Sequence, residues 1–143
     1  MTTPMDDVVR VGDGQWRIRS QRAQGGHSAE VEVTVHGPAD APAAGSPLRA
    51  FAAARAWLAL ARERQAAQDN QAALDAARAG LAELGQSYKT PGQPVLDDTS
   101  IHIDLADELA GKGKLPDAAR RMMGALDDRL GMYAQANAET IKE

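Results

Sequence analysis

The sequence predicts a mainly α protein: two antiparallel helical hairpins preceded by a small antiparallel β meander. Apolar residues make up 43% of the 143 residues and are dominated by alanine, whereas aromatic residues make up only 3%. Alanine at this density favours closely packed helices, because it has the highest helix propensity. Apolar residues recur at helical spacing from residue 48 to about residue 136, and short alternating runs are confined to residues 1–36.

Residues 1–36 are predicted to form a β ribbon. Its three strands are expected at about residues 8–11, 15–20 and 29–36. A Gly-Asp-Gly turn separates the first two strands, and the polar, glycine-bearing stretch of residues 20–28 is expected to be a loop. The valines of the third strand alternate with polar residues, so they share one face. Because such a ribbon is too small to stand alone, this face must cover the helices, a second subunit in a homodimer, or a partner.

Residues 37–47 are predicted to be a linker, because three prolines and two glycines lie within eleven positions. Ser46 and Pro47 end it in an arrangement that starts a helix. The serine hydroxyl can cap the helix, and proline at the first helical position has no N–H to leave unsatisfied. Four helices are predicted over about residues 48–68, 70–84, 99–110 and 116–136, within a helical region of residues 48–136. Residues 137–143 are expected to be a frayed tail.

The two predicted hairpins share a pattern of large and small apolar residues. The pattern is carried by Trp57, Leu60, Ala61, Ala73, Gly80 and Leu81, and then by Leu105, Ala106, Gly113, Leu115, Ala118, Met122, Ala125 and Leu126. Small residues suit points where two helices cross closely, and large ones fill the groove between them. The pattern resembles tetratricopeptide repeats, in units of about residues 54–85 and 99–133. The second unit is also similar to the kinesin-light-chain type of repeat. A generic four-helix antiparallel bundle is the alternative.

The resemblance implies a scaffold that binds a protein or peptide on a surface lined by the first helix of each hairpin. The residues that would face this partner are Arg55, Arg62, His102 and Glu108. A small, acidic, cysteine-free chain is also similar in composition to many bacterial secretion chaperones. The sequence therefore predicts a non-catalytic protein-interaction module, adaptor or chaperone-like, that uses no cofactor.

No pattern in the sequence is typical of a catalytic or metal site. His102 lies near Asp98 and Asp104, but a metal ion needs three or four convergent ligands. Asp104, Asp107 and Glu108 are neighbours on one predicted helix and are expected to form a solvated acidic face. The serines lack the context of a nucleophile elbow, and the glycine-containing turns are too short to be phosphate loops.

The absence of cysteine, of a signal peptide and of any long apolar run predicts a soluble, cytoplasmic protein that does not enter a membrane. The net charge of −4 argues against general attraction to nucleic acid. Two alternatives stay open. One is a DNA-binding regulator with a helix-turn-helix at about residues 105–126, which carries Arg120 and Arg121. The other is a small-molecule binder or enzyme with its site between ribbon and helices, and a deep pocket beside His102 with converging polar groups would favour it.

Overall fold

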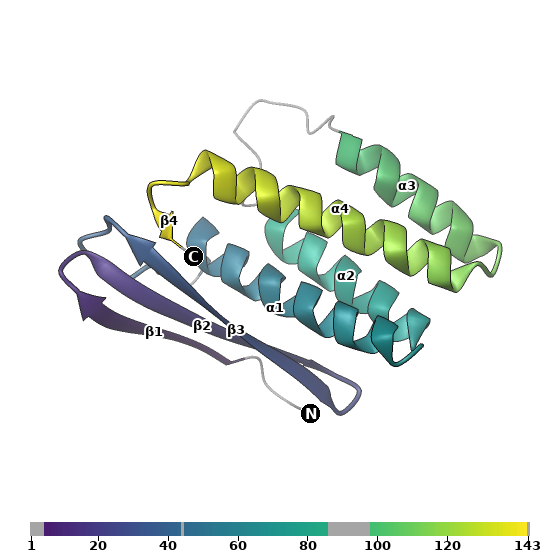
Figure 1. The fold of residues 1–143 in the computed structure, drawn as a ribbon, viewed down its shortest axis with the longest axis horizontal. Helices are drawn as coiled ribbons and strands as arrows, with labels where there is room; N and C mark the ends of the chain where they lie inside the picture. Colours follow the sequence, from purple (N-terminus) through teal and green to yellow (C-terminus); the bar gives the residue numbers. More distant parts are fainter. Residues whose placement is uncertain (1–4, 44, 86–97, 143) are drawn as a thin grey trace.

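The computed structural model describes residues 5–43, 45–85 and 98–142. It contains an antiparallel sheet and four helices, so the predicted order of a β meander followed by helices is confirmed (Figure 1). The strands are β1 (Met5–Gly12), β2 (Gln15–Gln24), β3 (His27–His36) and β4 (Ile141–Lys142), which lie in the order β1-β2-β3-β4. The helices are α1 (Pro47–Ala66), α2 (Asn70–Gly85), α3 (Asp98–Gly111) and α4 (Leu115–Ala136). None of the helices in these ranges is both long and apolar enough to cross a bilayer.

The hairpin between β2 and β3 is tighter than the sequence predicts, and the loop expected at residues 20–28 is wrong. The two strands pair without interruption from Gln15 opposite His36 to Gln24 opposite His27. Gly25 and Gly26 connect them, with φ values of 56° and 82°. Positive φ at both central residues gives a two-residue turn whose twist matches that of the flanking strands. The polar residues before and after this turn therefore remain in the strands.

The C-terminal segment returns to the sheet, in contrast to the frayed tail that the sequence predicts. After α4 the chain reverses, because the N–H groups of Thr140 and Ile141 both donate to the carbonyl of Asn137. Ile141 then lies opposite Val35 in an antiparallel pair between β4 and β3. The Ile141 side chain is buried, so this segment is anchored by both backbone hydrogen bonds and apolar contact.

The start of α1 is as predicted. Ser46 is its N-cap, and the Ser46 hydroxyl accepts a hydrogen bond from the Arg49 N–H at 3.4 Å. Pro47 is the first residue of the helix. The linker thus delivers the chain directly from the end of β3 onto the inner face of the sheet.

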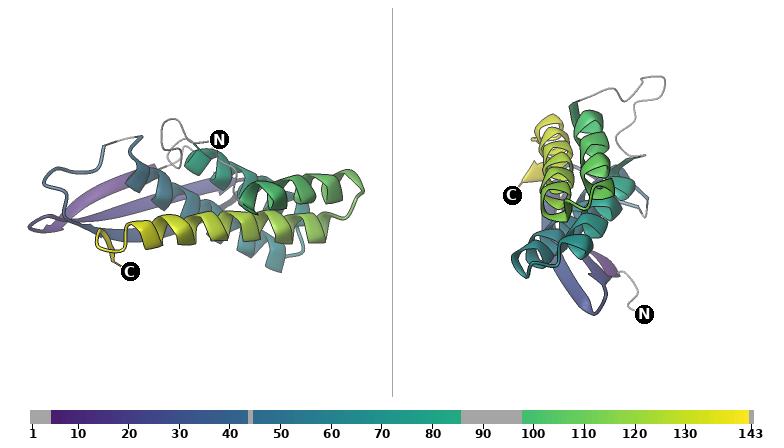
Figure 2. Two further views of the ribbon diagram at one scale, coloured as in Figure 1. Left: turned by 90° about the horizontal axis from the view of Figure 1, so that it is seen from above. Right: turned by 90° about the vertical axis from the view of Figure 1, so that its right-hand side faces the viewer.

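The helices stack on one face of the sheet in two layers (Figures 1 and 2). α1 lies on β2 and β3 and packs beside α2, while α4 packs on α1 and α2 and α3 lies beside α4 in the outer layer. A single core joins sheet and helices. Its largest buried side chains are Ile18, Val33, Val35, Phe51, Leu60, Leu74, Leu84, Met122 and Leu126. The apolar face of the ribbon therefore covers the helices of its own chain.

Most of the small residues of the repeat pattern are buried between helices, whereas Gly113 lies in the exposed turn between α3 and α4. The buried small residues are Ala61, Ala73, Gly80, Ala106, Ala118 and Ala125. Of the second hairpin, α4 makes the main contact with the first hairpin. As a result Leu105 of α3, which the pattern assigns to the interior, is 38% exposed, and Ile101 is 59% exposed.

Gly80 marks the closest approach of α2 to its neighbours. A Cβ atom at this position would lie 2.6 Å from Leu126 Cδ2 and 3.1 Å from Trp57 Cβ. Leu126 is fully buried, so it has little room to move aside. We expect Gly80→Ala to lower the free energy of unfolding by about 1–3 kcal/mol in a urea titration, although alanine is the better helix former.

Gly124 of α4 provides the matched control. It is exposed, and no neighbouring atom lies within 4 Å of the position that a Cβ would take. Gly124→Ala should therefore raise the free energy of unfolding by about 0.5–1 kcal/mol through helix propensity alone. Equal stabilisation by both substitutions would contradict the close crossing at Gly80.

Candidate functional site

A groove of about 220 Å³ lies between α1, α4 and β3. Most of its lining is apolar and consists of Val31, Phe51, Leu58, Ala59, Leu130, Gly131 and Ala134. Three charged residues, Arg55, Arg62 and Asp127, complete the lining. Two of the four residues predicted to face a partner therefore meet at one site.

Helical spacing brings these side chains together. A single stripe of α1 supplies Phe51, Arg55, Leu58 and Arg62, and a single stripe of α4 supplies Asp127, Leu130, Gly131 and Ala134. Residues three or four positions apart lie on the same face of a helix. On α4 the middle of the stripe is Gly131, whose missing side chain leaves space between the two helices. The groove thus follows from the way α4 packs along α1.

Arg55 is the half-buried cation of the groove. Its guanidinium carbon lies 5.8 Å from the centroid of the Phe51 ring, within the range of a cation–π contact. Burial lowers the pKa of Arg55, and Arg62 lowers it further, while Asp127 acts in the opposite direction. A lowered pKa means that the cation is stabilised less well here than in water. An anion in the groove would consequently interact with Arg55 more strongly than with an arginine in full contact with solvent.

Arg62 lies at the exposed end of the groove. It forms an ion pair with Asp127 of α4 at 3.3 Å, and the two side chains are 60% and 59% exposed. Such an exposed pair stabilises a fold very little, so a carboxylate from another molecule can compete for the Arg62 guanidinium. With two guanidinium groups and one carboxylate in its lining, the groove carries an excess of positive charge.

The apolar floor of the groove is held in place by the core. Phe51 is 1% exposed, and its ring stacks on Tyr133 of α4 with centroids 5.2 Å apart. Burial also raises the pKa of the Tyr133 hydroxyl. The floor is therefore formed before any partner arrives, as is usual for binding sites.

The other two residues predicted to face a partner lie elsewhere. His102 is on α3, where its Nδ1 accepts a hydrogen bond from Arg121 of α4 at 3.1 Å. Glu108 is on α3 and forms an exposed ion pair with Lys112 at 3.1 Å. The four residues do not share one surface, because α3 lies beside α4 in the outer layer and not along α1.

A second groove, of about 430 Å³, lies between α3 and α4 beside His102. Its polar groups come from His102, Asp117, Arg120, Arg121 and Asp128. Several of them bind one another: Arg120 pairs with Asp117 at 3.4 Å, and Arg121 donates to His102. The two arginines and the two carboxylates balance in charge. Over the residues that the structure describes, no group of three His, Asp or Glu side chains is arranged to hold a metal ion.

The exposed face of α4 bears on the helix-turn-helix alternative. Arg120 and Arg121 are accompanied on this face by Asp117, Asp127 and Asp128. A recognition helix binds a polyanion and presents several basic or polar side chains to base edges. Three carboxylates among two arginines disfavour that role.

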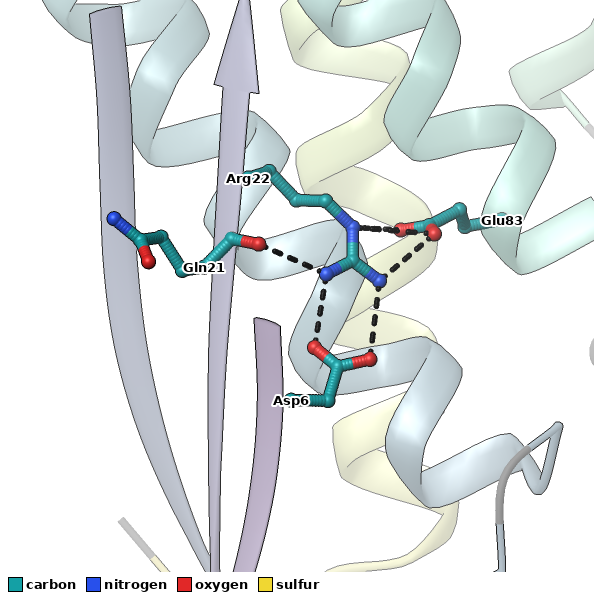
Figure 3. Close-up of polar contacts among 4 residues, drawn as sticks. All are labelled: Asp6, Gln21, Arg22 and Glu83. Atoms are coloured by element: carbon teal, nitrogen blue, oxygen red, sulfur yellow. Dashed lines mark hydrogen bonds and ion pairs between the residues drawn. The ribbon is translucent and has the colours of Figure 1, made fainter. Parts of the chain in front are cut away.

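A buried ion cluster lies between the sheet and the helices (Figure 3). Arg22 of β2 is 5% exposed. Its guanidinium donates to the Asp6 carboxylate at 2.8 and 3.3 Å, to the Glu83 carboxylate at 2.9 and 3.2 Å, and to the Gln21 carbonyl at 3.0 Å. All five N–H groups of the guanidinium are used in these bonds. The cluster therefore ties β1 and β2 to α2 and leaves no Arg22 donor for a ligand in the adjoining cavity of about 300 Å³.

The Asp6 carboxylate is ionised in this cluster. Burial opposes ionisation, but the hydrogen bonds and positive charge of Arg22 outweigh it, so the pKa of Asp6 is lowered. Arg22 is not predicted as a buried residue from the sequence, because residues 20–28 are polar and indicate a loop. The available signal is the alternation from Trp16 and Ile18, which continues through residue 22 up to the glycine pair.

Comparisons of this chain with protein-family models, with curated proteins and with solved structures gave no match. Its function is therefore inferred from the groove itself.

Proposed function

We propose that this chain is a non-catalytic protein-interaction module, adaptor or chaperone-like, that binds an acidic and partly apolar segment of another protein. The observation that carries the proposal is the convergence of Arg55 and Arg62 over the apolar floor of the groove between α1, α4 and β3. Guanidinium groups bind carboxylates through charge-assisted hydrogen bonds. An adjacent apolar side chain would lose its contact with water against Val31 and Ala134, which are only partly buried in the lining.

The size of the groove supports a protein partner over a free small molecule. Its volume of about 220 Å³ is below the roughly 300–1,000 Å³ of typical small-molecule sites. It suits one or two side chains of a larger partner. The groove beside His102 is larger. Its charges are balanced and partly paired with one another, so it attracts a charged ligand less strongly than the groove between α1, α4 and β3.

Two further expectations from the sequence, the type of helical hairpin and the cellular location, belong to this proposal. Each helical hairpin is proposed to be tetratricopeptide-like, on the basis of the small residues at its crossing. The protein is proposed to act in the cytoplasm, which agrees with a chain that contains no cysteine.

The proposal is tested by reversing the charge of the groove. Peptides selected on the wild-type protein from a displayed random library should contain Asp or Glu close to Leu, Phe or another large apolar residue. Binding of a selected peptide should fall about 100-fold or more in Arg55→Glu plus Arg62→Glu, because two charge-assisted hydrogen bonds are replaced by repulsion. Fluorescence anisotropy with the labelled peptide measures this loss.

The matched control is Arg78→Glu plus Arg120→Glu. These arginines are exposed and each pairs with an aspartate, as Arg62 does, so the change in net charge is the same. The control should bind the peptide within about threefold of wild type, since distant exposed charges are screened by salt. Selected peptides without acidic residues, or equal losses in both double variants, would overturn the proposed function.

A further inference from the structure

The edge of β3 beside the groove is covered over only part of its length. β4 pairs with β3 at Thr34 and Val35. Within the described part of the chain, no other strand pairs with this edge. Because β3 begins at His27, its edge continues past β4 for most of the strand. Val31, which lies in this stretch, lines the groove.

The pairing with β4 shows which backbone groups face the open edge. The His36 N–H donates to the Thr140 carbonyl at 2.7 Å, on the β4 side of the strand. Alternate residues of an antiparallel strand direct their N–H and C=O groups to the same neighbour. Glu32 and Glu30 therefore direct these groups to the open edge, whereas Val31 directs its own to β2. Both glutamates are exposed, so an approaching chain can reach this edge.

We propose that the partner segment binds as an added β-strand on this edge of β3, in line with β4 and antiparallel to β3. The inference rests on the proposed function and names the conformation of the bound segment. Backbone hydrogen bonds to Glu30 and Glu32 would supply affinity without regard to sequence. Every second side chain of the added strand would point to the same face as Val31 and enter the groove.

The direction of α1 sets the order of side chains in the segment. α1 runs antiparallel to β3 (Figure 1), and Arg64 near its end contacts His27 at the start of β3 at 3.0 Å. A segment antiparallel to β3 therefore runs in the direction of α1, from the Phe51 end of the groove towards Arg62. Its apolar residue comes first and its carboxylate follows on the C-terminal side, as an Asp or Glu side chain or as a free C-terminus.

Hydrogen exchange measured by NMR tests the added strand directly. The probe is the tightest peptide from the library selected on the wild-type protein. Its binding should slow exchange of the Glu30 and Glu32 amides by about tenfold or more, since each N–H gains a hydrogen bond. The Val31 and Val33 amides, already bonded to β2, should change little.

N-methylation of the peptide provides the second readout. Methylation at every second residue should weaken binding about tenfold per site, while methylation at the intervening residues should leave it unchanged. A helical peptide would instead be weakened at every interior position. The affinity of the peptide with a free C-terminus is compared with that of the same peptide with a C-terminal amide. Weaker binding of the amide identifies the C-terminal carboxylate as the bound group, and equal binding identifies an Asp or Glu side chain.

Failure of this inference is separable from failure of the proposed function. If Arg55→Glu plus Arg62→Glu abolishes peptide binding but the Glu30 and Glu32 amides stay unprotected, the groove binds a segment and the added strand is wrong. If the same amides become protected at high protein concentration without peptide, a second copy of the chain is the occupant and the inference is overturned. If no peptide is selected, or if binding ignores the two arginines, both are wrong.

Discussion

Arg22→Met is expected to lower the free energy of unfolding by about 3 kcal/mol at neutral pH. Methionine keeps the apolar stem of the side chain but removes the cation between Asp6 and Glu83. Two carboxylates would then face each other in a site where they keep only 24% and 33% of their side-chain exposure. This residual exposure places the loss at the lower end of the range for breaking a buried ion pair. Urea unfolding measures it.

A triple variant separates lost packing from uncompensated charge. In Asp6→Asn, Arg22→Met, Glu83→Gln all three charges are absent, so most of the lost stability should return, as neutral replacements of buried ion pairs often show. If the triple variant is as unstable as Arg22→Met alone, the loss comes from shape rather than from the carboxylates. If Arg22→Met is as stable as wild type, the cluster does not hold the sheet on α2.

The free energy of unfolding should depend on pH with opposite signs in wild type and in Arg22→Met. In wild type the folded state lowers the pKa of Asp6, so this carboxylate stabilises the fold when ionised. That contribution is complete above the unfolded pKa of about 3.9 and is lost as the pH falls through the lower folded value. In Arg22→Met the Asp6 carboxylate loses its cationic partner and faces Glu83, so the pKa of Asp6 should rise. The variant should therefore gain stability as the pH falls from neutral towards about 5, where wild type changes little.

Local signals in the sequence predict most helices and strands of this fold. The features that they do not predict depend on pairing between distant parts of the chain. Ser46 and Pro47 specify the start of α1 by their own chemistry, and the valines of β3 specify its buried face. The end of β2 depends on the two glycines at its turn, which override the polarity of residues 20–24. The position of β4 depends on the pairing of Ile141 with Val35, which is distant in the sequence, and no residue close to Ile141 predicts this pairing.

The candidate site is predictable to the extent that one helix carries it. Arg55 and Arg62 share a stripe of α1, so their proximity follows from helical spacing. Asp127 and Leu130 join them only because α4, rather than α3, packs along α1. That choice depends on the fit of whole helix surfaces, including the contact of Gly80 with Leu126. His102 lies away from the groove because its helix, α3, does not pack along α1.

Phe51→Ala is expected to lower the free energy of unfolding by about 3–5 kcal/mol. The Phe51 ring is 1% exposed and stacks on Tyr133, so its removal leaves a cavity where α1 meets α4. The same ring lies beneath the Arg55 guanidinium. Its loss should therefore disturb both the core and the groove. Urea unfolding and peptide binding by anisotropy, measured on the folded fraction, report the two effects.

Phe51→Leu separates the two roles of the ring. Leucine fills much of the volume, so the loss of stability should stay below about 1.5 kcal/mol. It offers no π face to Arg55, and a cation–π contact of about 0.5–1 kcal/mol corresponds to a two- to fivefold weaker peptide complex. Peptide binding that is unchanged in Phe51→Leu would mean that Arg55 is positioned by other contacts. A loss of stability equal to that of Phe51→Ala would mean that the stack on Tyr133, and not the filled volume, holds α4 against α1.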